Sequence, residues 1–129
     1  MGKRWHILFC DEIEDACPVT EFINECKPKH QVKVLRLLSL LEEMGPTLRR
    51  PYSDLLYDGI HELRFNLSSN KVRVLYFFCY ESFIVLYYAF FKNTQKVPEK
   101  FIKKVVNYRK DFLTKVSEKN IRKNLHVIF

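Results

Sequence analysis

The 129-residue sequence lacks the motifs that many hydrolases and nucleotide-binding folds carry. It has no G-x-S-x-G elbow, no P-loop, no G-x-G-x-x-G segment and no helical H-E-x-x-H. Its four cysteines form no C-x-x-C pair and have no companion histidines at the spacing of zinc ligands. We therefore expect neither a metal site nor a bound cofactor.

The sequence also has no apolar run long enough to span a membrane. The aromatic-rich stretch from Val72 to Phe91 is interrupted by Arg73, Glu81 and Ser82. The first residues lack the apolar run and small-residue cleavage site of a secretory signal. We therefore expect no membrane partner, a cytoplasmic location and free cysteine thiols in a reducing interior.

Acidic side chains are scarce in the second half of the chain. Residues 61–129 hold 14 basic and 5 acidic side chains, a net charge of +9, whereas residues 1–60 hold 8 basic and 10 acidic ones. The electrostatic field of this excess positive charge raises the local concentration of an anionic partner. Charge alone does not choose between a nucleic acid, an acidic protein and an anionic membrane.

The length and the hydrophobic pattern predict a single α+β domain over residues 1–129. A helix begins at Pro18 and runs over 18–26, and apolar residues at helical spacing predict a second over 29–44, ending before Gly45. The two helices should pack as a hairpin on one face of a small sheet. Strands are expected at 5–10, 61–67, 71–80 and 83–91, the last three as an antiparallel meander.

The remaining segments are less regular. Residues 11–15 are acidic and are expected to form a loop, and residues 48–59 to connect elements, with one turn of helix at 54–57. Pro98 opens a C-terminal helix with a basic outer face. The tail over 117–129 either adds a strand or packs on a partner, and its pattern does not decide between these roles.

Four basic residues are expected to meet at one end of the meander. Arg64 and Arg73 lie on neighbouring strands, and Lys92 and Lys96 follow the last strand. Several fixed cations around one phosphate stabilise the extra charge of a pentacoordinate transition state. The arrangement thus predicts metal-free cleavage of RNA by its own 2′-hydroxyl.

Each of these residues also has a purely structural interpretation. Arg64 taken alone is explained equally well by an ion pair with Glu62 or Asp58, and single lysines are commonly solvated. His61 is more often a partly buried strand residue than a catalytic base. The aromatic side chains are mostly core, with Phe77 and Tyr88 as the candidates to face outward and stack on a base.

Three spaced segments carry a family resemblance. They are G-x-x-E-L-R at 59–64, V-R-V-L-Y at 72–76 and F-x-K-x-T-x-K-x-P at 90–98. In their order and spacing they resemble the RelE/HigB toxins of bacterial toxin–antitoxin pairs, and most closely the phage-derived, Gp49-like branch of that superfamily. The similarity runs from about Trp5 to Leu113.

The resemblance implies a RelE-like fold and an endoribonuclease, an mRNA interferase that cuts messenger RNA on the ribosome and arrests growth. It also implies inhibition by a cognate antitoxin, expected to be of the helix-turn-helix type. By this match Arg64 and Arg73 clamp the scissile phosphate, while lysines bind the backbone or neutralise charge. The catalytic set is Arg64, Arg73, Lys92 and Tyr88, and the RNA-binding set is Lys96, Lys71, His61 and Phe77.

Two positions depart from the family pattern. Asn93 stands where a second adjacent basic residue is common, and Tyr87 or Tyr88 replaces a histidine of the last strand. A tyrosine whose pKa is lowered by nearby cations would serve in general acid–base chemistry.

Two other functions stay open. One is a toxin similar to ParE that inhibits DNA gyrase by binding, and the other is an inactive member that only binds an antitoxin. The nuclease hypothesis requires Arg64, Arg73 and Lys92 to converge on one phosphate-sized pocket without being locked in internal ion pairs.

Overall fold

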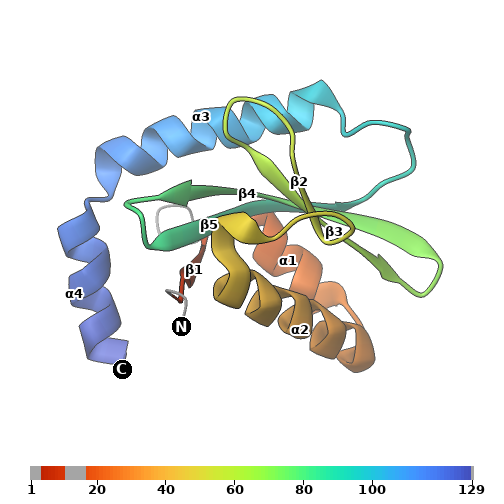
Figure 1. Ribbon diagram of the computed structural model, residues 1–129, viewed down its shortest axis with the longest axis horizontal. Helices are drawn as coiled ribbons and strands as arrows, with labels where there is room; N and C mark the ends of the chain where they lie inside the picture. Colours follow the sequence, from red (N-terminus) through yellow and green to blue (C-terminus); the bar gives the residue numbers. More distant parts are fainter. Residues whose placement is uncertain (1–3, 11–16, 129) are drawn as a thin grey trace.

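The structure is a computed structural model that describes residues 4–10 and 17–128, with side chains described as far as Lys123. The acidic loop expected at 11–15 lies outside the described residues. Helices and strands together confirm the α+β class (Figure 1). The strands are β1 (His6–Phe9), β2 (Ser53–Leu55), β3 (His61–Leu67), β4 (Asn70–Cys79) and β5 (Phe83–Phe91). The helices are α1 (Pro18–Glu25), α2 (Pro28–Met44), η2 (Gly45–Thr47), α3 (Glu99–Lys115) and α4 (Glu118–Ile128).

The five strands form one mixed sheet in the order β1-β5-β4-β3-β2. The expected antiparallel meander of β3, β4 and β5 is confirmed, and β1 adds to β5 in parallel. The turn of helix expected at 54–57 is wrong, because Ser53–Leu55 pair with β3 as strand β2. Three residues are too few to show an alternating pattern, so the sequence did not indicate this strand.

The helices cover both faces of the sheet (Figure 1). The hairpin of α1 and α2 lies on one face and α3 on the other. Alternation along β3 separates the two environments: Leu63, Phe65 and Leu67 are buried on the hairpin side, while Glu62 and Arg64 point toward α3. The site residues of β3 therefore lie on the face that α3 only partly covers.

The C-terminal tail forms helix α4 and not the strand that was one of its two expected roles. It packs on its own chain through the buried Ile121 and through Arg122, whose Nη2 donates to the Ser82 hydroxyl at 2.9 Å. None of the described helices is long and apolar enough to cross a membrane.

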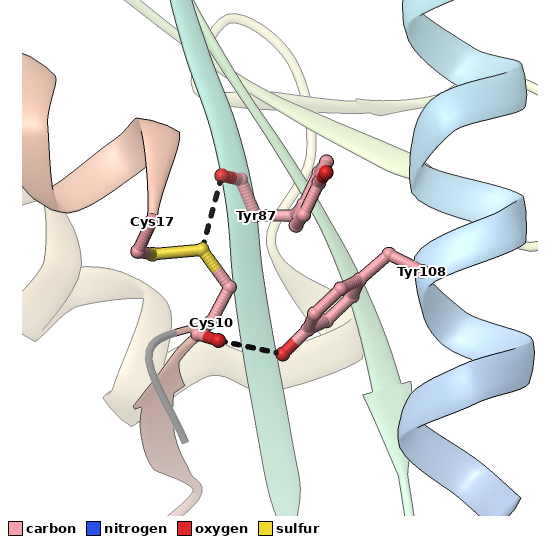
Figure 2. Close-up of a disulfide and its surroundings, with 4 residues drawn as sticks. All are labelled: Cys10, Cys17, Tyr87 and Tyr108. Carbon is pink, nitrogen blue, oxygen red and sulfur yellow. Dashed lines mark hydrogen bonds between the residues drawn. A yellow bond between two sulfur atoms is a disulfide. The ribbon is translucent and has the colours of Figure 1, made fainter. Parts of the chain in front are cut away.

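A disulfide between Cys10 and Cys17 joins the end of β1 to the start of α1 (Figure 2). The carbonyl of Cys10 accepts a hydrogen bond from the Tyr108 hydroxyl at 3.1 Å, which ties the bridge to α3. The expectation of four free thiols is therefore wrong for this pair, while Cys26 and Cys79 are free. Because disulfides are uncommon in reducing compartments, the cysteines no longer support a cytoplasmic location, which stays a prediction.

Gly45 marks the point where α2 ends against the N-terminal strand. Its φ of +53° lies in the left-handed region, and a Cβ there would overlap the indole nitrogen of Trp5. The Trp5 ring is itself fixed by an edge contact with Phe78, at 5.1 Å between ring centroids. The chain therefore needs glycine at this position for two independent reasons.

We predict that Gly45→Ala lowers the free energy of unfolding by about 2–4 kcal/mol, through backbone strain and overlap with Trp5. Urea unfolding followed by circular dichroism measures the change. Ser39→Ala, an exposed change on α2, is the control and should stay within about 0.5 kcal/mol of the parent chain. A Gly45→Ala protein as stable as the parent would show that the Trp5 contact is loose.

Candidate nucleic-acid interface

A pocket of about 470 Å³ opens between the β2–β3 hairpin, the loop after β5 and the start of α3. Three of the four cations predicted from the sequence line it together, namely Arg64, Lys92 and Lys96. The loop that carries the lysines is anchored to the sheet, because the Lys92 amide donates to the carbonyl of Lys71 at 2.8 Å. Separate sheet segments thus bring these positive side chains to one place.

Arg73 lies apart from this pocket, although it is directly opposite Arg64 in the β3–β4 register. It is only 4% exposed and lines a neighbouring hollow together with Arg64, Lys71 and Tyr52. Its Nη1 donates to the carbonyl of Val72 at 2.9 Å. Arg64 thus lines both hollows, whereas Arg73 is outside the described residues that line the pocket.

Glu62 lies between the two arginines on the same face of the sheet. Its Oε2 accepts a hydrogen bond from Nη1 of Arg64 at 2.8 Å. Its Oε1 is 3.2 Å from Nε of Arg73, close enough for an ion pair. The N–H direction is poor there, so neither atom has a hydrogen-bond partner among the described residues.

This arrangement corrects the expected pair of free guanidinium clamps. Both arginines are engaged by Glu62, which is itself only 3% exposed. The Arg64–Glu62 ion pair is the structural interpretation that the spacing i, i+2 in a strand allowed, because such residues share one face. The requirement that these arginines stay outside internal ion pairs is not met in this structure.

Positive charge is nonetheless crowded around the pocket. Burial lowers the pKa of the Lys92 ammonium, and the nearby Arg73 guanidinium lowers it further. Burial also lowers the pKa of Arg73, with Arg64 as the next cause and Glu62 acting in the opposite direction. Burial, and then nearby cations, therefore disfavour the charged forms of Lys92 and Arg73, and an anion entering the pocket would relieve the repulsion between cations.

Two residues of the predicted RNA-binding set lie elsewhere. Phe77 is completely buried and packs on Phe112 of α3 at 6.0 Å between ring centroids, so its expected outward orientation is wrong. His61 is adjacent to Glu62 in the strand and therefore points to the opposite face, where it stacks on Tyr76 at 5.3 Å. Burial lowers the pKa of His61. Neither residue meets the pocket.

Tyr88 of the predicted catalytic set lies on the face covered by α3. A register shift between β4 and β5 pairs Leu75 with Tyr88 but Tyr76 with Leu86, so Tyr87 is an extra residue in β5. The Tyr88 ring then packs edge-on against Phe101, at 4.8 Å between centroids, with Nζ of Lys104 at 5.7 Å. Tyr88 is outside the set of described residues that line the pocket.

Lys71 and Asn93 line a third hollow, which Lys92 also lines. The missing second cation at position 93 therefore concerns the outer rim and leaves the pocket wall unchanged. Lys71 also lines the hollow that contains Arg73, so it lies between the two regions.

The pocket contains residues that the sequence analysis did not single out. Arg50 and Asp54 form an ion pair at 2.8 Å on one wall, and Tyr57 and Glu99 lie near the start of α3. The sequence offered two weak signals for them. One is the i, i+4 spacing of Arg50 and Asp54, and the other is the Asp58–Gly59 turn that follows Tyr57.

The family model described as "Phage derived protein Gp49-like (DUF891)" matches residues 21–110, about seven-tenths of the chain. The chain belongs to this family. The Gp49-like family is phage-derived and is part of the RelE-like toxin–antitoxin grouping. The match includes every residue that lines the pocket and ends within α3, so α4 lies beyond it. No curated protein matches the chain.

Because Glu62 neutralises two cations in this Gp49-like protein, its loss should be costly. We predict that Glu62→Gln lowers the free energy of unfolding by about 3–5 kcal/mol, since Arg73 then stays buried without a counter-ion. Urea unfolding measures this change. In the double variant Glu62→Gln/Arg73→Met most of the stability should return, because the buried charge is gone. Equal losses in the single and double variants would contradict this role for Arg73.

Proposed function

We propose that this Gp49-like protein is the toxin of a toxin–antitoxin pair and that it cleaves messenger RNA on the ribosome without a metal ion, as the RelE/HigB resemblance implies. An antitoxin that covers the basic face would hold it inactive. The observation that supports the proposal is the convergence of Arg64, Lys92 and Lys96 on one pocket beside a buried carboxylate.

The chemistry requires little from the protein beyond placement and charge. The 2′-oxygen of one nucleotide attacks the adjacent phosphorus and loses its proton to a base, and the bond to the 5′-oxygen breaks as that oxygen takes a proton from water. The products are a 2′,3′-cyclic phosphate and a 5′-hydroxyl. Lys92 and Lys96 stabilise the additional negative charge on the phosphate in the transition state.

Arg64 and Glu62 act together in this proposal. An incoming phosphate competes with Glu62 for the Arg64 guanidinium, which can bind a phosphate through two N–H groups. Once Arg64 turns to the phosphate, the Glu62 carboxylate is released to accept the 2′-hydroxyl proton as the general base. Arg73 is then a positioning residue that holds Glu62 in place.

The internal ion pairs favour a second candidate function. With both arginines bound to Glu62 and with Asn93 in place of a cation, the chain would bind its antitoxin without cutting RNA. Such a protein is either an inactive family member or, like ParE, a toxin that acts on DNA gyrase by binding. Growth and RNA cleavage separate these cases.

We predict codon-position cuts when the purified protein is added to translating ribosomes and the message is examined by toe-printing. Lys92→Ala should reduce the rate of these cuts about 100-fold, because one charge that stabilises the transition state is lost. Lys119→Ala, which removes the same charge from the exposed side of α4, is the matched control and should cut like the parent chain.

Absence of cuts with the parent chain would contradict the nuclease proposal. Growth arrest without cuts would then favour the gyrase-binding toxin, and normal growth of cells that express the chain alone would favour the inactive binder. Equal loss in Lys92→Ala and Lys119→Ala would show that overall charge, and not the pocket, controls cleavage.

A further inference from the structure

An exposed aromatic ring lies at the pocket on the side of the β2–β3 hairpin. Tyr57 is 40% exposed and lines the pocket. It begins a tight turn in which the Ile60 amide donates to the Tyr57 carbonyl at 3.0 Å. The two central residues, Asp58 and Gly59, both have positive φ, as a type I′ hairpin turn requires. The position of Tyr57 is therefore fixed by the turn.

Helix α3 holds the same turn from the other side. Nη1 of Arg109 donates to the carbonyl of Asp58 at 2.5 Å. Burial raises the pKa of the Tyr57 hydroxyl, and the nearby Glu99 carboxylate of α3 raises it further. A ring held in this way loses little conformational freedom when a flat ligand stacks on it.

Three carboxylates line the pocket, and they differ in their partners. Asp54 is paired with Arg50 and Glu62 with Arg64, each at 2.8 Å. Glu99 has no ion pair among the described residues, and its carboxylate lies close enough to the Tyr57 hydroxyl to accept a hydrogen bond from it. Its place in the first turn of α3 suits the helix dipole, which accounts for an acidic residue there but not for its position in the wall of a basic pocket.

We propose that the pocket binds one unpaired RNA base stacked on Tyr57, and that Glu99 selects a base with an exocyclic amino group by accepting a hydrogen bond from it. The volume of about 470 Å³ is within the range of small-ligand pockets. Lys92 and Lys96 on the same walls supply the charge for the attached phosphates. This inference rests on the proposed function in taking RNA as the ligand.

Cytosine and uracil provide a matched pair of ligands. The two rings have the same size, but cytosine carries an amino donor at position 4 where uracil carries a carbonyl acceptor. A carboxylate accepts a hydrogen bond from the amino group of cytosine and repels the carbonyl oxygen of uracil. A pocket wall that contains the Glu99 carboxylate therefore predicts that cytosine binds more tightly than uracil.

Fluorescence anisotropy with labelled six-nucleotide RNAs tests the inference. Both RNAs, all cytidine and all uridine, carry 2′-O-methyl groups so that no cleavage occurs. The full chain should bind the cytidine RNA about tenfold more tightly than the uridine RNA. In Glu99→Gln the ratio of the two affinities should fall close to one, because an amide both donates and accepts.

Tyr57→Ala tests the stacking platform. It should weaken binding of both RNAs by about 5- to 150-fold, the range for loss of one aromatic–base contact, and leave the ratio between them unchanged. Tyr57→Phe keeps the ring and removes the hydroxyl that competes for Glu99, so it should bind the cytidine RNA at least as tightly as the parent chain does. Phe91→Ala is the matched control, because it removes an aromatic side chain that is 53% exposed and does not line this pocket.

The outcomes separate this inference from the proposed function. If Lys92→Ala weakens RNA binding while Tyr57→Ala and Glu99→Gln bind like the parent chain, the pocket binds RNA through its positive charge. The proposed base site is then wrong. A parent chain without preference for cytidine overturns the role of Glu99. If the parent chain binds neither RNA, the base site is wrong, and the toe-printing assay on ribosomes decides separately whether the proposed cleavage stands.

Discussion

The ion-paired Glu62 determines how the rest of the site is arranged. A carboxylate that is only 3% exposed must be paired, and here Arg64 and Arg73 from two adjacent strands share it. Because both cations lie on one face of the sheet, slipping either strand by a single residue would turn one of them into the apolar core on the other face. The pairing thus fixes the register of β3 and β4 and holds two positive groups on the sheet face that forms the floor of the pocket, Arg64 inside the pocket and Arg73 outside it.

The remaining groups depend on how elements meet above that floor. Helix α3 covers only part of the sheet face, so a pocket stays open between its first turn and the β2–β3 hairpin. The loop after β5 brings Lys92 and Lys96 to this opening, and Arg109 ties the hairpin turn to α3. The pocket is therefore built from three segments that are far apart in the sequence. Its chemical character depends on their packing more than on any one motif.

Sequence patterns predicted the helices and strands in which buried and exposed positions alternate regularly over many residues. The apolar–polar alternation of β3 and the apolar repeats of α2 and α3 each extend over seven or more residues, and the structure confirms these three elements. Features that depend on one residue were missed. The extra residue in β5 turned Tyr88 toward α3, and the bridge between Cys10 and Cys17 needs a contact that no spacing indicates. The sequence placed Arg64 near the lysines and offered Glu62 as one of two ion-pair partners for it, but no pattern indicated that Arg73 shares the same carboxylate.

The two arginines differ in how readily they exchange partners. The Arg64 side chain is 21% exposed and lines the open pocket, whereas that of Arg73 is 5% exposed and also donates to a backbone carbonyl. Arg64 lines both the pocket and the neighbouring hollow, whereas Arg73 lines the hollow alone and has less exposed surface to offer a phosphate. If Arg64 leaves, Arg73 still keeps Glu62 paired, so the buried carboxylate does not lose its last counter-ion. The two arginines that looked equivalent in sequence therefore differ in their surroundings: Arg64 is the one open to a ligand in the pocket, and Arg73 is the one held by the fold.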